Sequence, residues 1–82
     1  MIHMVKLQSK SGIKESADIT IIELIDILAK KGMPAVEILK FDKQLQEHLH
    51  VDGANIYKEF ADIIFSPYTI TNEEAIKRGI PI

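Results

Sequence analysis

The sequence predicts a mainly α-helical fold, a single small domain over residues 1–82 with three to four helices and at most one short two-stranded β pairing. Three observations support this class. Apolar residues recur at helical spacing near residues 21–31, 34–49 and 54–64. A chain of 82 residues is enough for one domain only. It contains no cysteine, so neither a disulfide nor a thiolate-bound metal supplements the core.

The N-terminal segment MIHMVKLQ predicts a short strand. If the chain is extended there, His3, Val5 and Leu7 share one side. The run SKSG then ends the alternation. The expected partner strand is the segment 66–70, where Ser66 and Pro67 break the preceding helical pattern.

The first helix is expected from about Ile21 to Lys31, with Gly32 ending it. Thr20 and Glu23 have the spacing of a capping box, in which the two side chains satisfy free amide groups at a helix start. At about 100° per residue, the apolar side chains cover an arc of roughly 200°, which is too wide for a helix lying on a surface. We therefore expect burial on more than one side, and the candidate protein-interface residues are Ile21, Ile22, Leu24, Ile25, Ile27 and Leu28.

The remaining helices follow from the same spacing and from their end signals. The second begins with Pro34, which is tolerated in a first turn, and runs to about residue 49 along an apolar stripe of Ile38, Phe41, Leu45 and Leu49. The third is expected over residues 54–64, on Ile56, Phe60, Ile63 and Ile64. A short fourth helix begins at Thr71 or Asn72 and stops at Gly79, with acidic residues in its first turn and basic residues in its last.

The most suggestive chemistry lies in EHLHVDG, residues 47–53. His48, His50 and Asp52 form a His-x-His-x-Asp run, which resembles the opening metal motif of the metallo-β-lactamase superfamily. That motif implies metal ligands on a loop after a strand, whereas the preceding FDKQLQEHL predicts a helix that would point the two imidazoles nearly opposite ways. Zinc also needs three or four ligands. We expect no metal or other cofactor, and interpret Asp52 and Gly53 as an N-cap and turn.

The sequence carries no recognised catalytic arrangement, so a non-enzymatic protein is expected. Its serine, histidine and acidic residues do not form a nucleophile elbow. The glycines are isolated at element boundaries, so they build no phosphate-cradling loop.

A helix-turn-helix DNA-binding regulator is the alternative, using the helices at about 21–31 and 34–49. Its recognition helix would present Glu37 and Asp42 to the phosphates, and Arg78 is the only arginine in the chain. Nucleic acid is therefore a less favoured partner than protein.

The preferred hypothesis is a small interaction or regulatory module that acts as a homodimer through its first helix. A domain of this size has few other elements to cover both flanks of that helix, and a large exposed apolar patch is rare in a monomer. The alternative is that the second and third helices enclose the first within one chain.

Charge and hydropathy suggest the setting and a further partner. Residues 33–64 carry six acidic residues against three lysines, which suits a partner with a basic surface. The apolar run from Ile19 to Ala29 is far short of a membrane span, and the N-terminus lacks the apolar region of a signal peptide. A cytoplasmic protein without a membrane partner is therefore expected.

Overall fold

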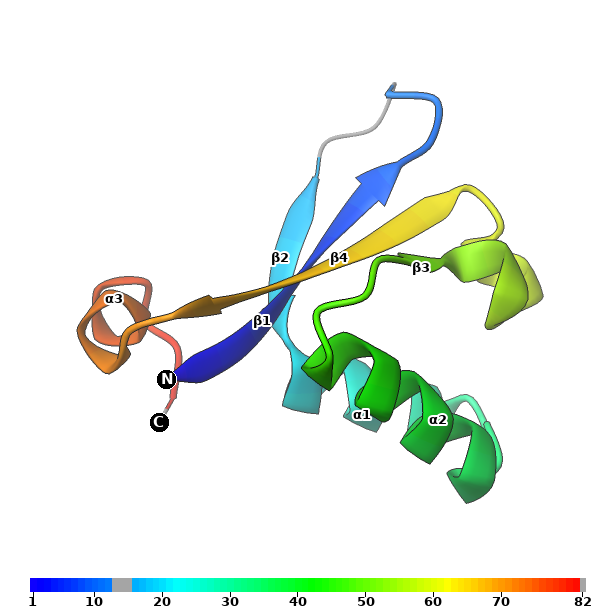
Figure 1. Cartoon of the computed structure of the whole chain (residues 1–82), viewed down its shortest axis with the longest axis horizontal. Coiled ribbons are helices and arrows are strands. Elements are labelled where there is room, and N and C mark those ends of the chain that lie inside the picture. Colours follow the sequence, from blue (N-terminus) through cyan, green and yellow to red (C-terminus); the bar gives the residue numbers. More distant parts are fainter. Residues whose placement is uncertain (13–15, 82) are drawn as a thin grey trace.

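The computed structural model describes residues 1–12 and 16–81, and within them the chain forms a four-stranded antiparallel sheet and three α-helices (Figure 1). The strands are β1 (Ile2–Ser9), β2 (Ala17–Thr20), β3 (Val51–Asp52) and β4 (Ile63–Ile70), in the order β2-β1-β4-β3. The helices are α1 (Ile21–Lys30), α2 (Ala35–Gln46) and α3 (Asn72–Lys77). The protein therefore has an α/β fold, and the prediction of a mainly helical domain is wrong.

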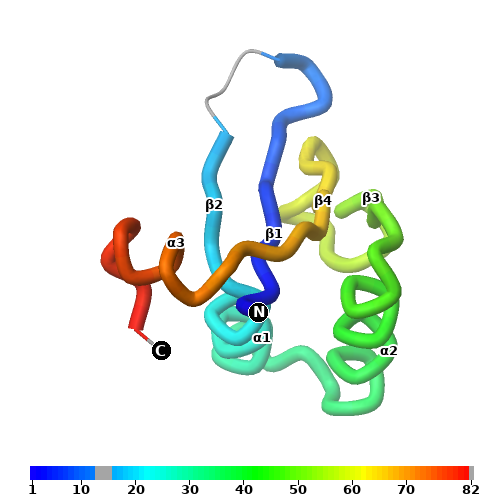
Figure 2. Tube along the Cα trace, turned by 60° about the vertical axis from the view of Figure 1, so that its left-hand side comes forward, coloured from blue at the N-terminus to red at the C-terminus, as the bar shows by residue number. Residues whose placement is uncertain are grey.

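The main core lies between the sheet and the layer of α1 and α2, which cover the same face (Figures 1 and 2). Val5 of β1 and Phe65 of β4 are fully buried there. The Phe65 ring meets the ring of Phe41 from α2 edge to face, with 5.3 Å between centroids. The helices complete this core with Ile21, Leu24, Leu28 and Leu45.

The opposite face of the sheet is covered at one end by α3. Met4 and Ile70 alternate with the residues of the main core and therefore point to this second side. They pack against Ala75 of α3, which is completely buried. The chain thus has a layer of helix on each face of its sheet.

The predicted pairing of the N-terminal segment with residues 66–70 is confirmed, and it extends further than expected. Strand β1 pairs with β4 along eight residues, from Ile2 opposite Ile70 to Ser9 opposite Ile63. Pro67 lies within β4, although proline cannot donate a hydrogen bond to a neighbouring strand. The position is tolerated because β3 pairs only with Ile64 and Phe65, so that among the described residues no strand lies along the rest of that side of β4.

The predicted third helix over residues 54–64 is absent. The chain instead makes two 3-10 turns, η1 (Gly53–Asn55) and η2 (Lys58–Phe60), and then enters β4 at Ile63. A Cβ at Gly53 would overlap the carbonyl oxygen of Phe60, so the segment folds back tightly on a residue that has to be glycine. A short helix rich in β-branched residues is marginal by itself, and the long ladder with β1 outweighs it.

The other helices agree with the sequence apart from their ends. The Thr20 side chain accepts a 3.0 Å hydrogen bond from the Glu23 amide at the start of α1, which is the threonine half of the predicted capping box. Helix α2 begins at Ala35 and stops at Gln46, earlier than predicted. The short last helix is capped by Thr71, whose hydroxyl accepts from the Glu74 amide at 3.1 Å.

Candidate binding surfaces

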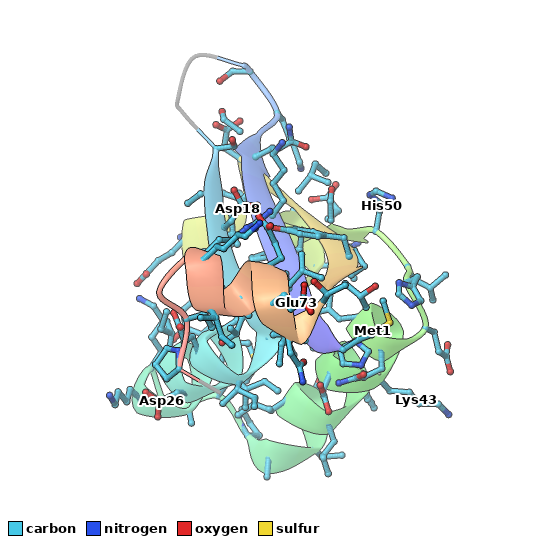
Figure 3. The ribbon with its side chains drawn as sticks, turned by 90° about the vertical axis from the view of Figure 1, so that its left-hand side faces the viewer. Met1, Asp18, Asp26, Lys43, His50 and Glu73 are labelled. Carbon is cyan, nitrogen blue, oxygen red and sulfur yellow. The ribbon has the colours of Figure 1, made fainter. Side chains whose placement is uncertain are left out.

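The three candidate metal ligands point to different partners. His48 follows α2 with a positive φ of 62°, and its ring centroid lies 6.4 Å from that of His3. His50 projects outward (Figure 3), with its Nδ1 3.0 Å from Ser66 Oγ. Among residues 1–12 and 16–81 no group of three His, Asp or Glu side chains is placed to hold a metal ion.

Asp52 is held by two interactions that are separate from the two histidines. Its Oδ1 accepts a 2.9 Å hydrogen bond from the Ala54 amide, so it caps the turn η1. Lys10 Nζ lies 2.6 Å from the same oxygen. The hydrogen bond from Lys10, followed by that from the Ala54 amide, lowers the pKa of Asp52 below its ordinary value. This carboxylate is therefore already committed to a cation and a backbone amide.

The structure divides the six apolar residues predicted as an interface on α1. One set is shielded from solvent in the core and consists of Ile21, Leu24 and Leu28. The remaining residues lie toward the surface: Ile22 is 81% exposed, Ile27 is 40% exposed and Ile25 is half-buried. Only this second set can contact another molecule. One part of the wide apolar arc therefore faces the core, and the other part faces solvent.

An apolar groove of about 510 Å³ lies beside the start of α1. Ile22 and Ile25 line it together with Met1, Ile2 and Pro81, which come from the two ends of the described chain. Its rim carries Glu23 of α1 and Asp42 and Gln46 of α2. Sequence analysis missed the contributions of Met1 and Pro81, because no local pattern shows that the termini meet at this helix.

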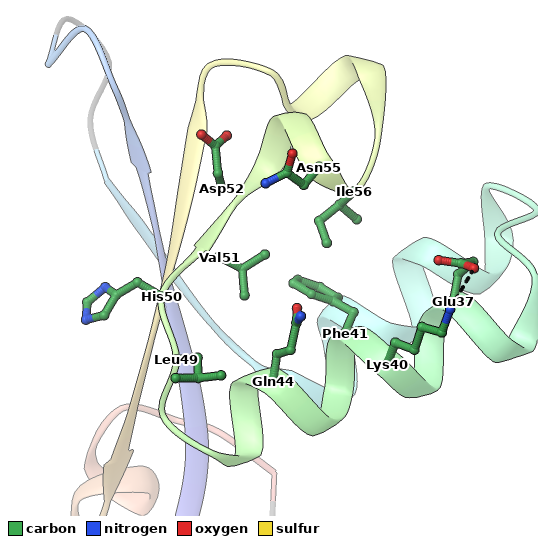
Figure 4. A pocket seen from close by; sticks show the side chains of 10 residues that line it. All are labelled: Glu37, Lys40, Phe41, Gln44, Leu49, His50, Val51, Asp52, Asn55 and Ile56. Atoms are coloured by element: carbon green, nitrogen blue, oxygen red, sulfur yellow. Dashed lines mark ion pairs between the residues drawn. The ribbon is translucent and has the colours of Figure 1, made fainter.

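A smaller pocket of about 260 Å³ lies between α2 and β3 (Figure 4). Its floor is apolar and consists of Phe41, Val51 and Ile56, while Leu49 borders it near the end of α2. In Figure 4, Val51 points toward Phe41 whereas His50 points to the opposite side of the strand.

The rim of this pocket is polar and is contributed by α2 and η1. Glu37 and Lys40 form an ion pair with 3.7 Å between the charged atoms. Gln44 and Asn55 approach from opposite sides, and within the described part of the chain neither carboxamide has a hydrogen-bond partner. Sequence analysis missed this pocket too, because it placed Asn55 and Ile56 on a helix.

Comparison with models of protein families, with curated proteins and with solved structures finds no match to this chain. Across residues 1–12 and 16–81, no helix combines the length and apolar character needed to cross a membrane.

Proposed function

We propose that the protein is a non-enzymatic interaction module that works as a homodimer, joined through the outer side of α1 and the apolar groove beside it. The observation that supports this most is Ile22, which is 81% exposed at the edge of a groove of about 510 Å³. An aliphatic side chain gains nothing from contact with water, whereas burial in an interface contributes about 1.5–3 kcal/mol.

The geometry suits a two-fold interface. In such a dimer the same patch meets itself, so each copy must supply both a projecting group and the hollow that receives it. Ile22 and Met1 are the projecting groups, at 81% and 78% exposure. The groove that they border supplies the hollow, and its apolar lining continues with Ile2, Ile25 and Pro81.

Charge at the groove predicts how the dimer responds to salt. Glu23 and Asp42 lie on the rim, and neither forms an ion pair with a described residue. Asp26 on the outer side of α1 is neutralised by Lys30, 2.9 Å away. Two copies would therefore bring uncompensated carboxylates together, so added salt strengthens the dimer by screening them.

The helix-turn-helix alternative has less support. The outer side of α2 exposes Val36 and Leu39, at 57% and 66%, and neither side chain can hydrogen-bond a base edge. Glu37 on the same helix is paired with Lys40, which reduces the positive charge available for phosphate.

Sedimentation velocity over a range of protein concentrations tests the dimer, because the monomer mass is 9.3 kDa. We expect a concentration-dependent species of twice that mass, more abundant at higher salt and lost in Ile22→Asp. The matched control is Ile76→Asp, since Ile76 is also an exposed isoleucine, at 64%, but lies on α3. A 9.3 kDa species at every concentration, or equal effects of the two substitutions, would contradict the proposal.

A further inference from the structure

We propose, on the basis of the dimer proposed above, that pH regulates this dimer and that protonation of His3 strengthens it. His3 of β1 lines the apolar groove beside α1, and so do Glu23 of α1 and Asp42 of α2. One titratable cation and two carboxylates therefore share the surface that meets its own copy. The charge on the histidine decides how strongly the two copies repel each other.

The two carboxylates of the groove have no cation of their own. Within the described part of the chain, neither Glu23 nor Asp42 forms an ion pair. Asp42 Oδ1 accepts a 3.4 Å hydrogen bond from Gln46 Nε2, and this carboxamide is neutral. Lys43, the neighbour of Asp42 along the chain, lies outside the groove. A two-fold dimer brings the same two carboxylates from both copies into one interface, so a positive charge in the groove relieves their repulsion.

His3 supplies that positive charge on acidification. Histidine is the side chain whose ordinary pKa lies between pH 5 and 8, so its charge changes where aspartate and glutamate are normally ionised. In the sheet His3 lies opposite Thr69 of β4, which is uncharged. The side chain of His3 is half-buried, and partly buried charges are screened by salt less than exposed ones. Protonation therefore offsets one of the two negative charges that each copy places in the groove.

His48 lies next to this position and adds to the effect. Its ring centroid is 6.4 Å from that of His3, and its side chain is exposed on the turn after α2. Two protonated rings repel each other within one copy, whereas the carboxylates of both copies attract them in the dimer. Glu47, the exposed neighbour of His48, forms no ion pair with a described residue and adds negative charge to the same turn. The dimer therefore accommodates the protonated histidines better than the monomer does.

Sedimentation velocity on the full chain without a histidine tag, at about pH 7.5 and about pH 5.5, tests this regulation. We expect the dissociation constant of the dimer to fall by about tenfold on acidification. His3→Gln should remove most of this change but leave the dimer intact at the higher pH. His50→Gln is the matched control and should keep the full response, because His50 lies outside the groove, with its Nδ1 3.0 Å from Ser66 Oγ. The α-amino group of Met1, which also lines the groove, is the same in every variant.

Asp42→Asn tests the same charges from the other partner, and it decides the question if His3→Gln does not fold. The asparagine keeps an oxygen that accepts from Gln46 but removes the negative charge. We expect this variant to form a tighter dimer than wild type at the higher pH and to gain less on acidification. Wild type should also respond less to added salt at the lower pH, because fewer uncompensated carboxylates then remain to be screened.

The outcomes separate the regulation from the dimer itself. A dimer whose dissociation constant is equal at the two pH values, or rises in acid, would overturn the regulation and leave the dimer in place. An unchanged response in His3→Gln or Asp42→Asn, or an equal loss of response in His50→Gln, would do the same. Wild-type protein that stays monomeric at both pH values would overturn the dimer and the regulation together.

Discussion

The Tyr68 hydroxyl donates a 2.7 Å hydrogen bond to Asp18 Oδ1, joining β4 to β2 although 50 positions separate the two residues. Met4 of β1 lies between these strands, opposite both Tyr68 and Thr20, so the phenol reaches across β1. Arg78 Nη1 donates to the same hydroxyl at 3.0 Å. A single side chain therefore fastens α3 and the edge strand β2 to the middle of the sheet.

Removing this hydroxyl should destabilise the fold. We expect Tyr68→Phe to lower the free energy of unfolding by about 0.5–1 kcal/mol, because it deletes two hydrogen bonds at a partly solvated site. Tyr57→Phe is the matched control, since the Tyr57 hydroxyl makes a single longer bond of 3.3 Å to the Lys31 carbonyl. Urea denaturation of both variants measures the difference, and a larger loss in Tyr57→Phe would contradict the structure.

The same hydroxyl predicts a loss of stability at high pH. Burial, followed by the hydrogen bond to Asp18, raises the pKa of Tyr68 above its ordinary value. A group whose pKa is raised on folding stabilises the fold below its unfolded pKa, and this contribution disappears as the pH rises through the folded value. Wild-type protein should therefore lose stability more steeply than Tyr68→Phe above about pH 10. Parallel slopes in thermal unfolding across this range would count against the assignment.

Local sequence patterns predicted the fold correctly where they agree with the pairing of the strands. They failed where a helical pattern lies in a segment that pairs as a strand. Thr20 caps α1 as expected, and the last helix starts at Asn72 as one of its two predicted starts, because both signals depend on residues only a few positions away. Residues 54–64 were predicted wrongly, because Phe60 and Ile63 fit a helical period while β1 supplies a long partner for the strand that follows. A pairing between segments some sixty residues apart leaves no sign in either segment alone.

The candidate surfaces were predictable only in part. The wide apolar arc of α1 was visible, yet nothing local distinguishes Leu24, which reaches the core, from Ile22, which reaches solvent. The sheet decides between them, because it covers one side of α1 and leaves the other open. The pocket at β3 could not be predicted, since it requires Gln44 and Asn55 to lie on opposite sides of one space, whereas Asn55 was expected on a helix.

The lowered pKa of Asp52 predicts that the protein loses stability in acid. The hydrogen bond from Lys10 lowers its pKa on folding, so its stabilising contribution is present above the unfolded pKa and disappears as the pH falls through the folded value. Asp52→Asn keeps a capping oxygen for the Ala54 amide but removes the charge. We expect its stability to fall less steeply than that of wild type below about pH 4. Identical acid branches in the two proteins would show that the pair with Lys10 contributes nothing.

The backbone conformation of His48 predicts that a glycine at this position stabilises the protein. Its φ of 62° lies in the left-handed region just after α2, which costs an L-residue about 1–2 kcal/mol. Glycine adopts this conformation freely but loses more chain entropy on folding. We therefore expect His48→Gly to raise the free energy of unfolding by roughly 0.5–1 kcal/mol. The exposed neighbour Glu47→Gly is the control and should be destabilising, because Glu47 has a negative φ of −83°. Destabilisation in His48→Gly would indicate that the imidazole makes a compensating contact.

A pair of truncations on α1 should separate the core from the proposed dimer surface. Leu24 is 1% exposed, so Leu24→Ala removes buried contacts and leaves a cavity, at a cost of about 2–5 kcal/mol at any protein concentration. Ile22 is 81% exposed, so Ile22→Ala in the monomer should change stability by no more than about 0.5 kcal/mol. At concentrations where the dimer forms, Ile22→Ala should become destabilising, because dissociation is then part of unfolding. Thermal unfolding at low and high concentration measures both effects, and a cost for Ile22→Ala that is independent of concentration would place this side chain within the monomer core.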